Sequence, residues 1–328
     1  MFGAKTKTEL LLLLAHKAKP LAHLYHKLFL FDKLTLGVLA VLPVLYLLSG
    51  RISSAGAMLL GGHPLIIAGA LVLIHRQESL PAWLRLLRYG YPVLCLTFFF
   101  GEVGGVVNAF LPFWLEPYLI RSDEILLGGR HGWQVFMPLL PPVGVEILAF
   151  AYWAYFLLLP GIAWLHYRGK SGNADKNLFY SYERVLARLC VVMYTCYTLF
   201  LVLPARGPHH ALQVHIETLL SGGWFFHAVL LIQKKSAVMG AAFPSSHVAA
   251  AFTLWLTLRH DFRIAFWSLL PVVALLAVST FLLQYHYIVD AAAGILLSLI
   301  VEWVMSHHEA PPAATPALQK RTQYAWQE

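Results

Sequence analysis

Eight apolar runs, separated by polar or charged segments, dominate the pattern of hydrophobic and polar positions along the chain. A helix needs about 20 apolar residues to cross a bilayer, and most of these runs approach that length. Backbone polar groups in lipid must be satisfied within each segment, so the runs predict helices rather than irregular spans. The predicted spans are residues 34–50, 56–75, 91–111, 144–166, 186–204, 245–259, 264–284 and 288–305.

The composition supports a membrane protein. The 328 residues are 59% hydrophobic and 12% charged, whereas soluble domains carry about 25% charged residues. The predicted fold class is therefore all-α, a polytopic membrane helix bundle of about eight transmembrane helices. The three cysteines all lie in apolar runs without disulfide or metal spacing, so we expect buried, inert thiols.

The formal charge of +8 suggests either a nucleic acid or an anionic membrane face as partner. The positions of the basic residues favour the membrane. With a cytoplasmic N-terminus, eighteen of the 24 basic residues fall in cytoplasmic segments, as the positive-inside rule requires. We therefore expect a multi-pass protein of the plasma or inner membrane, with both termini cytoplasmic and no nucleic-acid partner. The pattern favours no particular oligomeric state.

The stretch from Pro244 to His247 stands where an external loop enters the sixth run. Ser245 or Ser246 is a suitable N-cap, and Pro244 separates the loop from the helix. Unpaired N–H groups and the positive dipole end of the first turn suit a phosphate. His247 in that turn can donate a proton to a phosphate oxygen or a leaving group. For this motif alone, an ordinary helix start is the alternative.

His286 and Asp290 stand at i and i+4, on one face of the last span. A carboxylate that binds one imidazole nitrogen fixes the tautomer and leaves the other nitrogen free to attack. The alternative is a salt-bridged pair that caps the span. An outward run after His247 and a return run before His286 bring both histidines to the same extracytoplasmic level. Ionisable groups clustered at a membrane edge favour a functional site.

Together these motifs resemble the type 2 phosphatidic acid phosphatase superfamily, whose membrane enzymes use Pro-Ser-x-His and a later Ser-Arg-x5-His-x3-Asp. The resemblance implies that His286 is the nucleophile and forms a phosphohistidine. It implies that Asp290 orients His286, that His247 is the general acid, and that Ser245 and Ser246 help to hold the phosphate. It implies no metal and no cofactor.

The resemblance also implies a six-helix core, which the third to eighth spans would supply. The chain then divides into a basic interfacial segment at 1–33 and two N-terminal transmembrane helices at 34–90. The six-helix catalytic core follows at 91–306, and a disordered cytoplasmic tail at 307–328. A frayed basic tail is the alternative for the first segment.

Two positions depart from the family pattern. The early family motif is Lys-x6-Arg-Pro. Arg206 can match the arginine of this motif, but Leu199 occupies the position of its lysine. Thr280 stands where the late motif has arginine. The stretches around His247 and His286 are more similar to the inositol phosphorylceramide synthase branch, whose members transfer a phosphate-bearing head group between lipids.

The charge of the site bears on the substrate. A phosphomonoester carries nearly two negative charges and a phosphodiester one, so the loss of two cations favours the diester. Arg206 is the clearest remaining phosphate ligand, and Lys234 and Lys235 either assist or form a solvated pair. We expect transfer from a lipid phosphate to a lipid alcohol. The alternative reaction is hydrolysis of a phospholipid or polyprenyl (di)phosphate. Alternatives of another functional class are a lipid transporter and a non-catalytic scaffold.

Two further residues are candidates for substrate contact or support. Glu102 lies inside the third span, where we expect it to pair with a basic group such as Arg206 or to bind a head group; helix packing is the alternative. His209, His210 and His215 lack a fourth ligand for zinc. His210 is therefore a candidate for the entrance of the site or for phosphate binding.

Overall fold

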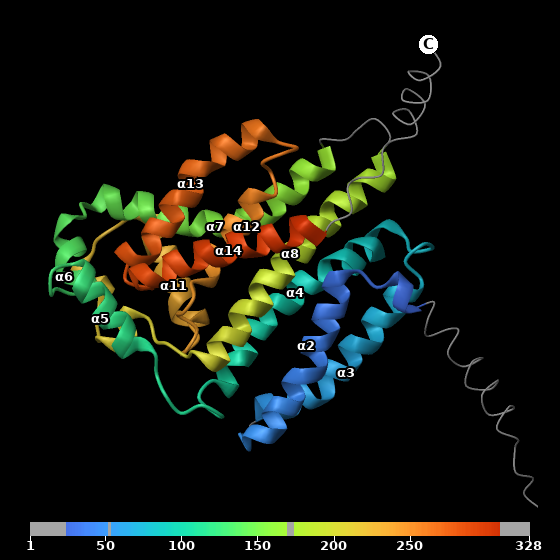
Figure 1. The fold of residues 1–328 in the computed structure, drawn as a ribbon, viewed down its shortest axis with the longest axis horizontal. Helices are drawn as coiled ribbons and strands as arrows, with labels where there is room; N and C mark the ends of the chain where they lie inside the picture. Colours follow the sequence, from blue (N-terminus) through green and yellow to red (C-terminus); the bar gives the residue numbers. More distant parts are fainter. Residues whose placement is uncertain (1–23, 52–53, 169–173, 309–328) are drawn as a thin grey trace, which may run out of the picture.

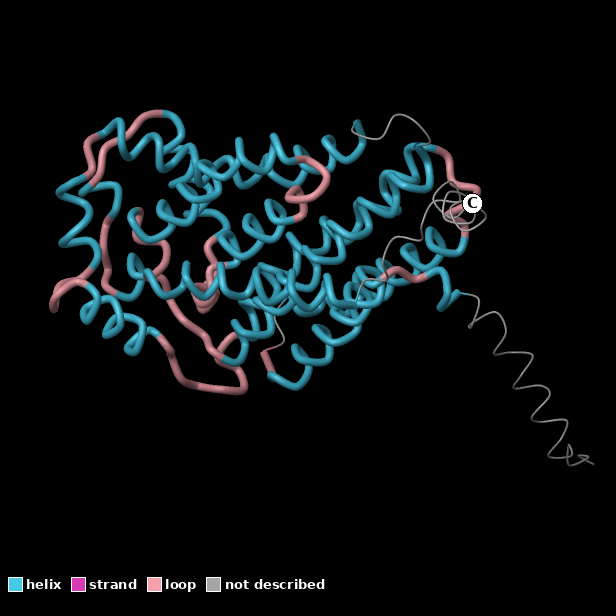
Figure 2. The backbone as a smooth tube through the Cα atoms, turned by 45° about the horizontal axis from the view of Figure 1, so that its top comes forward, coloured by secondary structure: helices cyan, strands magenta, loops and turns pink. Residues whose placement is uncertain are grey.

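The computed structural model describes residues 24–51, 54–168 and 174–308. Within these ranges the chain is helical and has no strand, apart from an isolated bridge between Ala205 and Ala241 (Figures 1 and 2). The predicted all-α membrane bundle is confirmed. Most of the predicted interfacial segment 1–33 and nearly all of the predicted tail 307–328 lie outside the described residues.

Eight helices correspond in order to the eight apolar runs. Two of them begin well before their runs, because residues that favour helix formation continue the helix beyond the apolar stretch: the third begins at residue 82 and the fifth at residue 174. The eight are α2 (Leu30–Ser49), α3 (Ser54–His75), α4 (Ala82–Val106), α7 (Pro142–Arg168), α8 (Ala174–Val202), α12 (Ser246–Leu256), α13 (Arg263–Leu282) and α14 (Ile288–His308).

Five helices are long and apolar enough to cross a membrane: α2, α13, α14 and the segments Pro142–Leu165 of α7 and Tyr182–Val202 of α8. The apolar helix α12 has only 11 residues. At ~1.5 Å per residue it covers roughly 16 Å, about half of the hydrocarbon core. The helix is thus shorter than the span predicted at 245–259, and the chain turns back before α13.

A buried ion pair joins the N-terminal helices to the rest of the bundle. Asp32 of α2 and Arg88 of α4 are both fully buried and share two hydrogen bonds, of 2.7 and 2.9 Å. The Tyr91 hydroxyl donates to the same carboxylate at 2.8 Å. Buried charges are tolerated when they are paired and hydrogen-bonded in this way. The network fixes α2 against α4.

Short helices cover the end of the bundle at which both α12 and α14 begin. They are α5 (Glu116–Leu126), α6 (Gly132–Phe136), α9 (Pro208–Ala211), α10 (Ile216–Leu219) and α11 (Trp224–Ser236), with a single 3₁₀ turn, η1 (Met137–Leu139). Of these, α5, α6 and α11 lie together at the left of Figure 1. These helices enclose the start of α12 and of α14, where the two histidine motifs lie.

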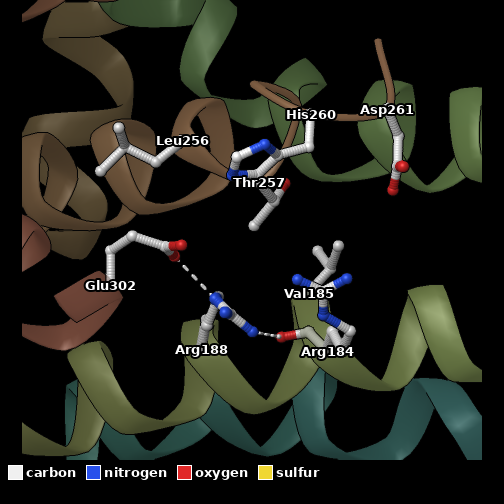
Figure 3. A pocket seen from close by; sticks show the side chains of 8 residues that line it. All are labelled: Arg184, Val185, Arg188, Leu256, Thr257, His260, Asp261 and Glu302. Atoms are coloured by element: carbon white, nitrogen blue, oxygen red, sulfur yellow. Dashed lines mark hydrogen bonds and ion pairs between the residues drawn. The ribbon is translucent and has the colours of Figure 1, made fainter. Parts of the chain in front are cut away.

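At the opposite end of α12, Glu302 of α14 holds two arginines. Its carboxylate lies 2.7 Å from Arg188 of α8 and 3.2 Å from Arg259 in the turn after α12. Figure 3 shows Glu302 and Arg188 facing each other beside a cavity of about 10 Å³, which is room for about one water molecule. Glu302 therefore ties three segments together and lies far from the histidine motifs.

Helices α12 and α14 start at the same end, run parallel and pack closely. Gly294 makes the close approach possible, because a Cβ atom there would lie 2.7 Å from the carbonyl oxygen of Ser245 and 3.2 Å from the backbone nitrogen of Ala249. Both contacts are with backbone atoms, which cannot rotate away as a flexible side chain can.

We expect Gly294→Ala to force α12 and α14 apart. Overpacking of this kind costs about 1–3 kcal/mol of stability, and here it also displaces the start of α12. The matched control is Gly161→Ala in α7, where a Cβ would meet nothing within 4 Å. Thermal unfolding of both variants in detergent measures the effect. Equal midpoints for the two variants would show that the close contact is unimportant.

Candidate active site

The loops that precede α9, α12 and α14 are joined through their backbones. The Ala205 N–H donates to the Gly240 carbonyl at 3.2 Å, and the Ala242 N–H donates back to the Ala205 carbonyl at 3.0 Å. The His209 N–H donates to the Gln284 carbonyl at 3.2 Å. Three segments far apart in the sequence therefore form one framework, and each carries candidate site residues.

His286 lies in the third of these loops and is nearly buried. Its Nδ1 atom lies 2.8 Å from the carbonyl oxygen of Ala242 and 3.4 Å from Oδ2 of Asp290. A carbonyl oxygen can only accept a hydrogen bond, so Nδ1 carries a proton, and in the neutral ring Nε2 therefore keeps its lone pair. The geometry thus supplies the tautomer expected from the sequence, but the nearer partner is a backbone carbonyl and not Asp290.

Asp290 connects the two histidine motifs. The residue is fully buried, and its Oδ2 atom accepts a hydrogen bond of 2.9 Å from the Tyr287 N–H. Its own backbone carbonyl accepts one of 3.0 Å from the Ser245 N–H. Asp290 therefore holds the loop of His286 with its side chain and the start of α12 with its backbone.

His247 occupies the first turn of α12 and faces His286. The two ring centroids are 6.4 Å apart in an edge-to-face arrangement. Tyr155 packs against the His247 ring at 4.8 Å, and the Tyr152 hydroxyl lies 3.4 Å from its Nε2 atom. Both rings line the same cavity, so a phosphate bound there can contact the two imidazoles. The sequence did not indicate either tyrosine, because nothing distinguishes them from other aromatic residues of the apolar run.

The N-cap of α12 is Ser245, one of the two residues that the sequence predicted for this position. The side chain of Ser245 makes no capping hydrogen bond. Its Oγ atom is buried without a hydrogen-bond partner among the described residues. Ser246 follows in the first turn and lines the same cavity as the two histidines. The start of α12 therefore offers N–H groups and one side-chain hydroxyl to a phosphate.

A cavity of about 410 Å³ contains both histidines. Ser246, Tyr285, Gln233 and the histidines form its polar end. The rest of the wall is largely apolar. It is lined by Val93, Leu96, Thr97 and Phe100 of α4, by Tyr155, Phe156, Leu159 and Pro160 of α7, by Leu189, Met193 and Tyr197 of α8, by Leu254 of α12, and by α11 and the loop after it, including Ile232, Val238, Ala241 and Ala242. From Tyr152 to Pro160 of α7 the wall extends roughly 12 Å along the bundle.

His209 and His210 line this cavity, and their rings pack against each other at a centroid distance of 3.9 Å with the planes tilted by 38°. The Nδ1 atom of His209 lies 3.0 Å from the Gln284 carbonyl. Burial lowers the pKa of His209 to about 4. Burial, and then the charge of Arg206, lower the pKa of His210. Both rings are therefore neutral hydrogen-bonding groups at pH 7.

The described residues contain no group of three or more His, Cys, Asp or Glu side chains that could hold a metal ion.

Arg206 lies beside the cavity but does not line it. Its guanidinium pairs with the buried carboxylate of Glu116 and lies over the Trp114 ring at 4.8 Å. The positive charge of Arg206 is therefore already paired with a carboxylate, which weakens its electrostatic attraction for a phosphate. The sequence did not indicate this partner, because Glu116 lies about 90 residues earlier in the chain.

Lys234 and Lys235 end α11 with exposed side chains, and neither lines the cavity. The structure thus gives these lysines no contact that would bring them to the histidines. Their role as phosphate ligands stays a prediction.

Glu102 pairs with His63 of α3 at 3.2 Å, and the other ring nitrogen of His63 lies 2.9 Å from the Leu39 carbonyl. The expected pairing of Glu102 with Arg206 is wrong, because Glu116 is the carboxylate that lies next to that arginine. Glu102 does not line the cavity. It joins α3 to α4, which corresponds to the packing alternative.

Comparison with known proteins tests the resemblance suggested by the motifs. The family model of the PAP2 superfamily matches residues 119–304, more than half of the chain. The chain belongs to the PAP2 superfamily. No curated protein and no solved structure matches the chain.

The match includes both histidine motifs, Arg206 and the helices from α7 through most of α14. Membership of the PAP2 superfamily supports a general function in lipid phosphate hydrolysis or transfer. It does not select the inositol phosphorylceramide synthase branch within the superfamily.

Proposed function

We propose that this PAP2 protein transfers a phosphate-bearing group from a lipid donor to a lipid hydroxyl through a phosphohistidine on His286. The observation that carries this proposal is the hydrogen bond from Nδ1 of His286 to the Ala242 carbonyl. It leaves Nε2 as the free nucleophilic nitrogen, in a cavity that also contains His247.

In the first step, Nε2 of His286 forms a bond to phosphorus, and the bond from phosphorus to the leaving oxygen breaks. His247 gives that oxygen a proton, so the leaving group departs as an alcohol. In the second step the acceptor hydroxyl loses its proton to His247 and bonds to phosphorus, and the N–P bond breaks. Asp290, 3.4 Å from Nδ1, stabilises the imidazolium character that develops on His286.

The apolar wall of the cavity supports a lipid as the substrate. A phosphate between His247 and His286 leaves the remaining volume to an apolar chain that runs between α4, α7 and α8. The roughly 12 Å length of this wall along α7 fits a segment of about nine methylene groups. Each buried methylene contributes about 0.8 kcal/mol, so chain length should strongly affect binding.

We expect Leu159→Trp, which places a bulky ring in the apolar part of the cavity, to raise KM for long-chain donors by about tenfold or more, since displacing two methylene groups suffices. A short-chain, water-soluble phosphate ester should be turned over as before. Initial rates in mixed micelles measure both. The control is Leu157→Trp on the same helix, whose side chain is exposed and does not line the cavity. The same KM change in both variants would contradict a lipid-binding cavity.

The charges near the histidines favour a phosphodiester donor over a monoester. His209 and His210 are neutral near pH 7, and Arg206 is paired with Glu116. Among the described residues that line the cavity, none is a lysine or an arginine. A dianionic phosphomonoester gains most from fixed cations, whereas a singly charged diester needs fewer.

Mass spectrometry of the products of the purified protein tests this function. The assay uses a mixed phospholipid panel, with and without acceptor alcohols, and the His286→Ala variant as control. A lipid with a new head group, formed only when acceptor is present, is the expected result. Release of the free phosphate-bearing head group or of inorganic phosphate, unaffected by acceptors, would instead identify a hydrolase.

We further propose that the histidine site faces the extracytoplasmic side, with both termini cytoplasmic. The asymmetric distribution of basic residues supports this orientation. A cysteine introduced at the exposed Ser221, in the loop before α11, tests it, because the three native cysteines are buried. Labelling of intact cells by a membrane-impermeant thiol reagent is expected, and labelling only after lysis would reverse the orientation.

A further inference from the structure

Helix α5 packs against the side of the catalytic loops that faces away from the cavity. Glu116 and Asp123, which are 3% and 7% exposed, are seven residues apart and so lie on one face of the helix, two turns from each other. Leu119 lies between them and packs in a cluster with Ala205 and Tyr287. Asp123 is therefore a buried carboxylate rather than a solvated one.

Each carboxylate of this face holds a different catalytic loop. Glu116 binds the guanidinium of Arg206 and accepts a hydrogen bond of 3.4 Å from its backbone N–H. Asp123 accepts a hydrogen bond of 3.1 Å from the N–H of Ile288, the first residue of α14. One rigid helix therefore contacts the loop before α9 and the loop that carries His286.

The contact of Asp123 lies next to that of Asp290. The consecutive N–H groups of Tyr287 and Ile288 each donate to a different carboxylate, the first to Asp290 at 2.9 Å and the second to Asp123. These two bonds fix the backbone directly after His286. Burial, with a further contribution from the charge of Asp290, raises the pKa of Asp123 to about 7. A hydrogen-bond acceptor is present on Asp123 in both protonation states.

We infer that α5 positions the nucleophile, with Asp123 as a positioning residue that sets the location of His286 through the Ile288 N–H. The inference rests on the proposed role of His286. Asp123 contacts neither the cavity nor the histidine ring. It acts only through the backbone, and a shift of about 1 Å in a reacting group reduces turnover by about a hundredfold. Glu116 holds the facing loop at a fixed distance from the same helix.

Three substitutions of Asp123 separate position from charge. Asp123→Asn keeps an acceptor oxygen at the same reach, so kcat should stay within about threefold of the original. Asp123→Ala removes the acceptor, and Asp123→Glu moves it outward by one methylene group. Both should lower kcat by about ten- to a hundredfold while KM changes less than about threefold. The matched control is Glu124→Ala, because Glu124 is the next residue of α5 and its carboxylate pairs with Arg121 and His131 rather than with a catalytic loop.

Steady-state kinetics with a chromogenic phosphate ester, together with thermal unfolding in detergent, provide the measurements. Rescue by asparagine with loss in the glutamate variant is the expected pattern, and it does not depend on whether Asp123→Ala folds. Unchanged kcat in the glutamate variant, or equal losses in all three variants, would overturn the positioning role. Absence of turnover in the original protein would instead overturn the proposed function.

Discussion

His286→Ala is expected to abolish turnover, with kcat reduced by about 10³-fold or more. The alanine variant has no nitrogen to form the bond to phosphorus, and loss of a nucleophile costs far more than loss of a binding contact. The variant should still fold, because within the described part of the chain the polar contacts of the His286 side chain are limited to the Ala242 carbonyl and the Asp290 carboxylate. Initial rates with a phosphate ester, alongside thermal unfolding, measure this.

An assay of substrate binding completes the experiment. Binding of a non-hydrolysable phosphonate analogue by His286→Ala with nearly unchanged affinity is expected, since α12 and the apolar wall remain intact. Retained turnover in a folded variant would exclude His286 as the nucleophile. Loss of both turnover and binding would instead assign His286 to substrate binding.

The second large effect concerns His247→Gln. General acid catalysis contributes about 10²- to 10⁴-fold, so turnover of an alkyl phosphodiester should fall by that range. A donor with a nitrophenolate leaving group needs no proton to depart, and its first step should therefore be nearly normal. Glutamine keeps a polar group near the Tyr152 hydroxyl, which lies 3.4 Å from Nε2 of the histidine.

The comparison of the two donors makes this prediction specific. A burst of nitrophenolate followed by slow turnover is expected for His247→Gln, because the second step still lacks the base that accepts the proton from the acceptor. Equal losses for the alkyl and the nitrophenyl donors, without a burst, would contradict the assignment of His247 as the general acid.

Much of the fold was predictable from the sequence, because each apolar run must satisfy its backbone polar groups within a helix. Eight runs became eight helices in the expected order. The ends were less predictable. Helix α8 continues through polar residues before its apolar run, and α12 stops at Leu256, where the chain turns back toward α13. Such boundaries depend on packing between helices, which periodicity along one segment does not contain.

The proximity of the two histidines followed from the motifs, since a helical hairpin returns the chain to its starting level. Their surroundings did not follow. The Ala242 carbonyl that fixes the tautomer of His286 is a backbone group. Because every residue has a backbone carbonyl, the sequence does not indicate which one will accept this hydrogen bond. The pairings of Arg206 with Glu116 and of Glu102 with His63 depend on which helices are neighbours. The sequence does not distinguish Asp123 from a surface carboxylate, because its burial depends on the packing of α5 against α14.

The covalent intermediate tests the central claim most directly. His247→Gln protein is mixed with the nitrophenyl donor, quenched in alkali at the end of the burst, digested and analysed by mass spectrometry. The peptide that contains His286 should carry the added mass of the transferred phosphate-bearing group, and the doubly substituted protein that also has His286→Ala should carry none. A complete burst with no adduct on His286, or with the adduct on another residue, would contradict the account.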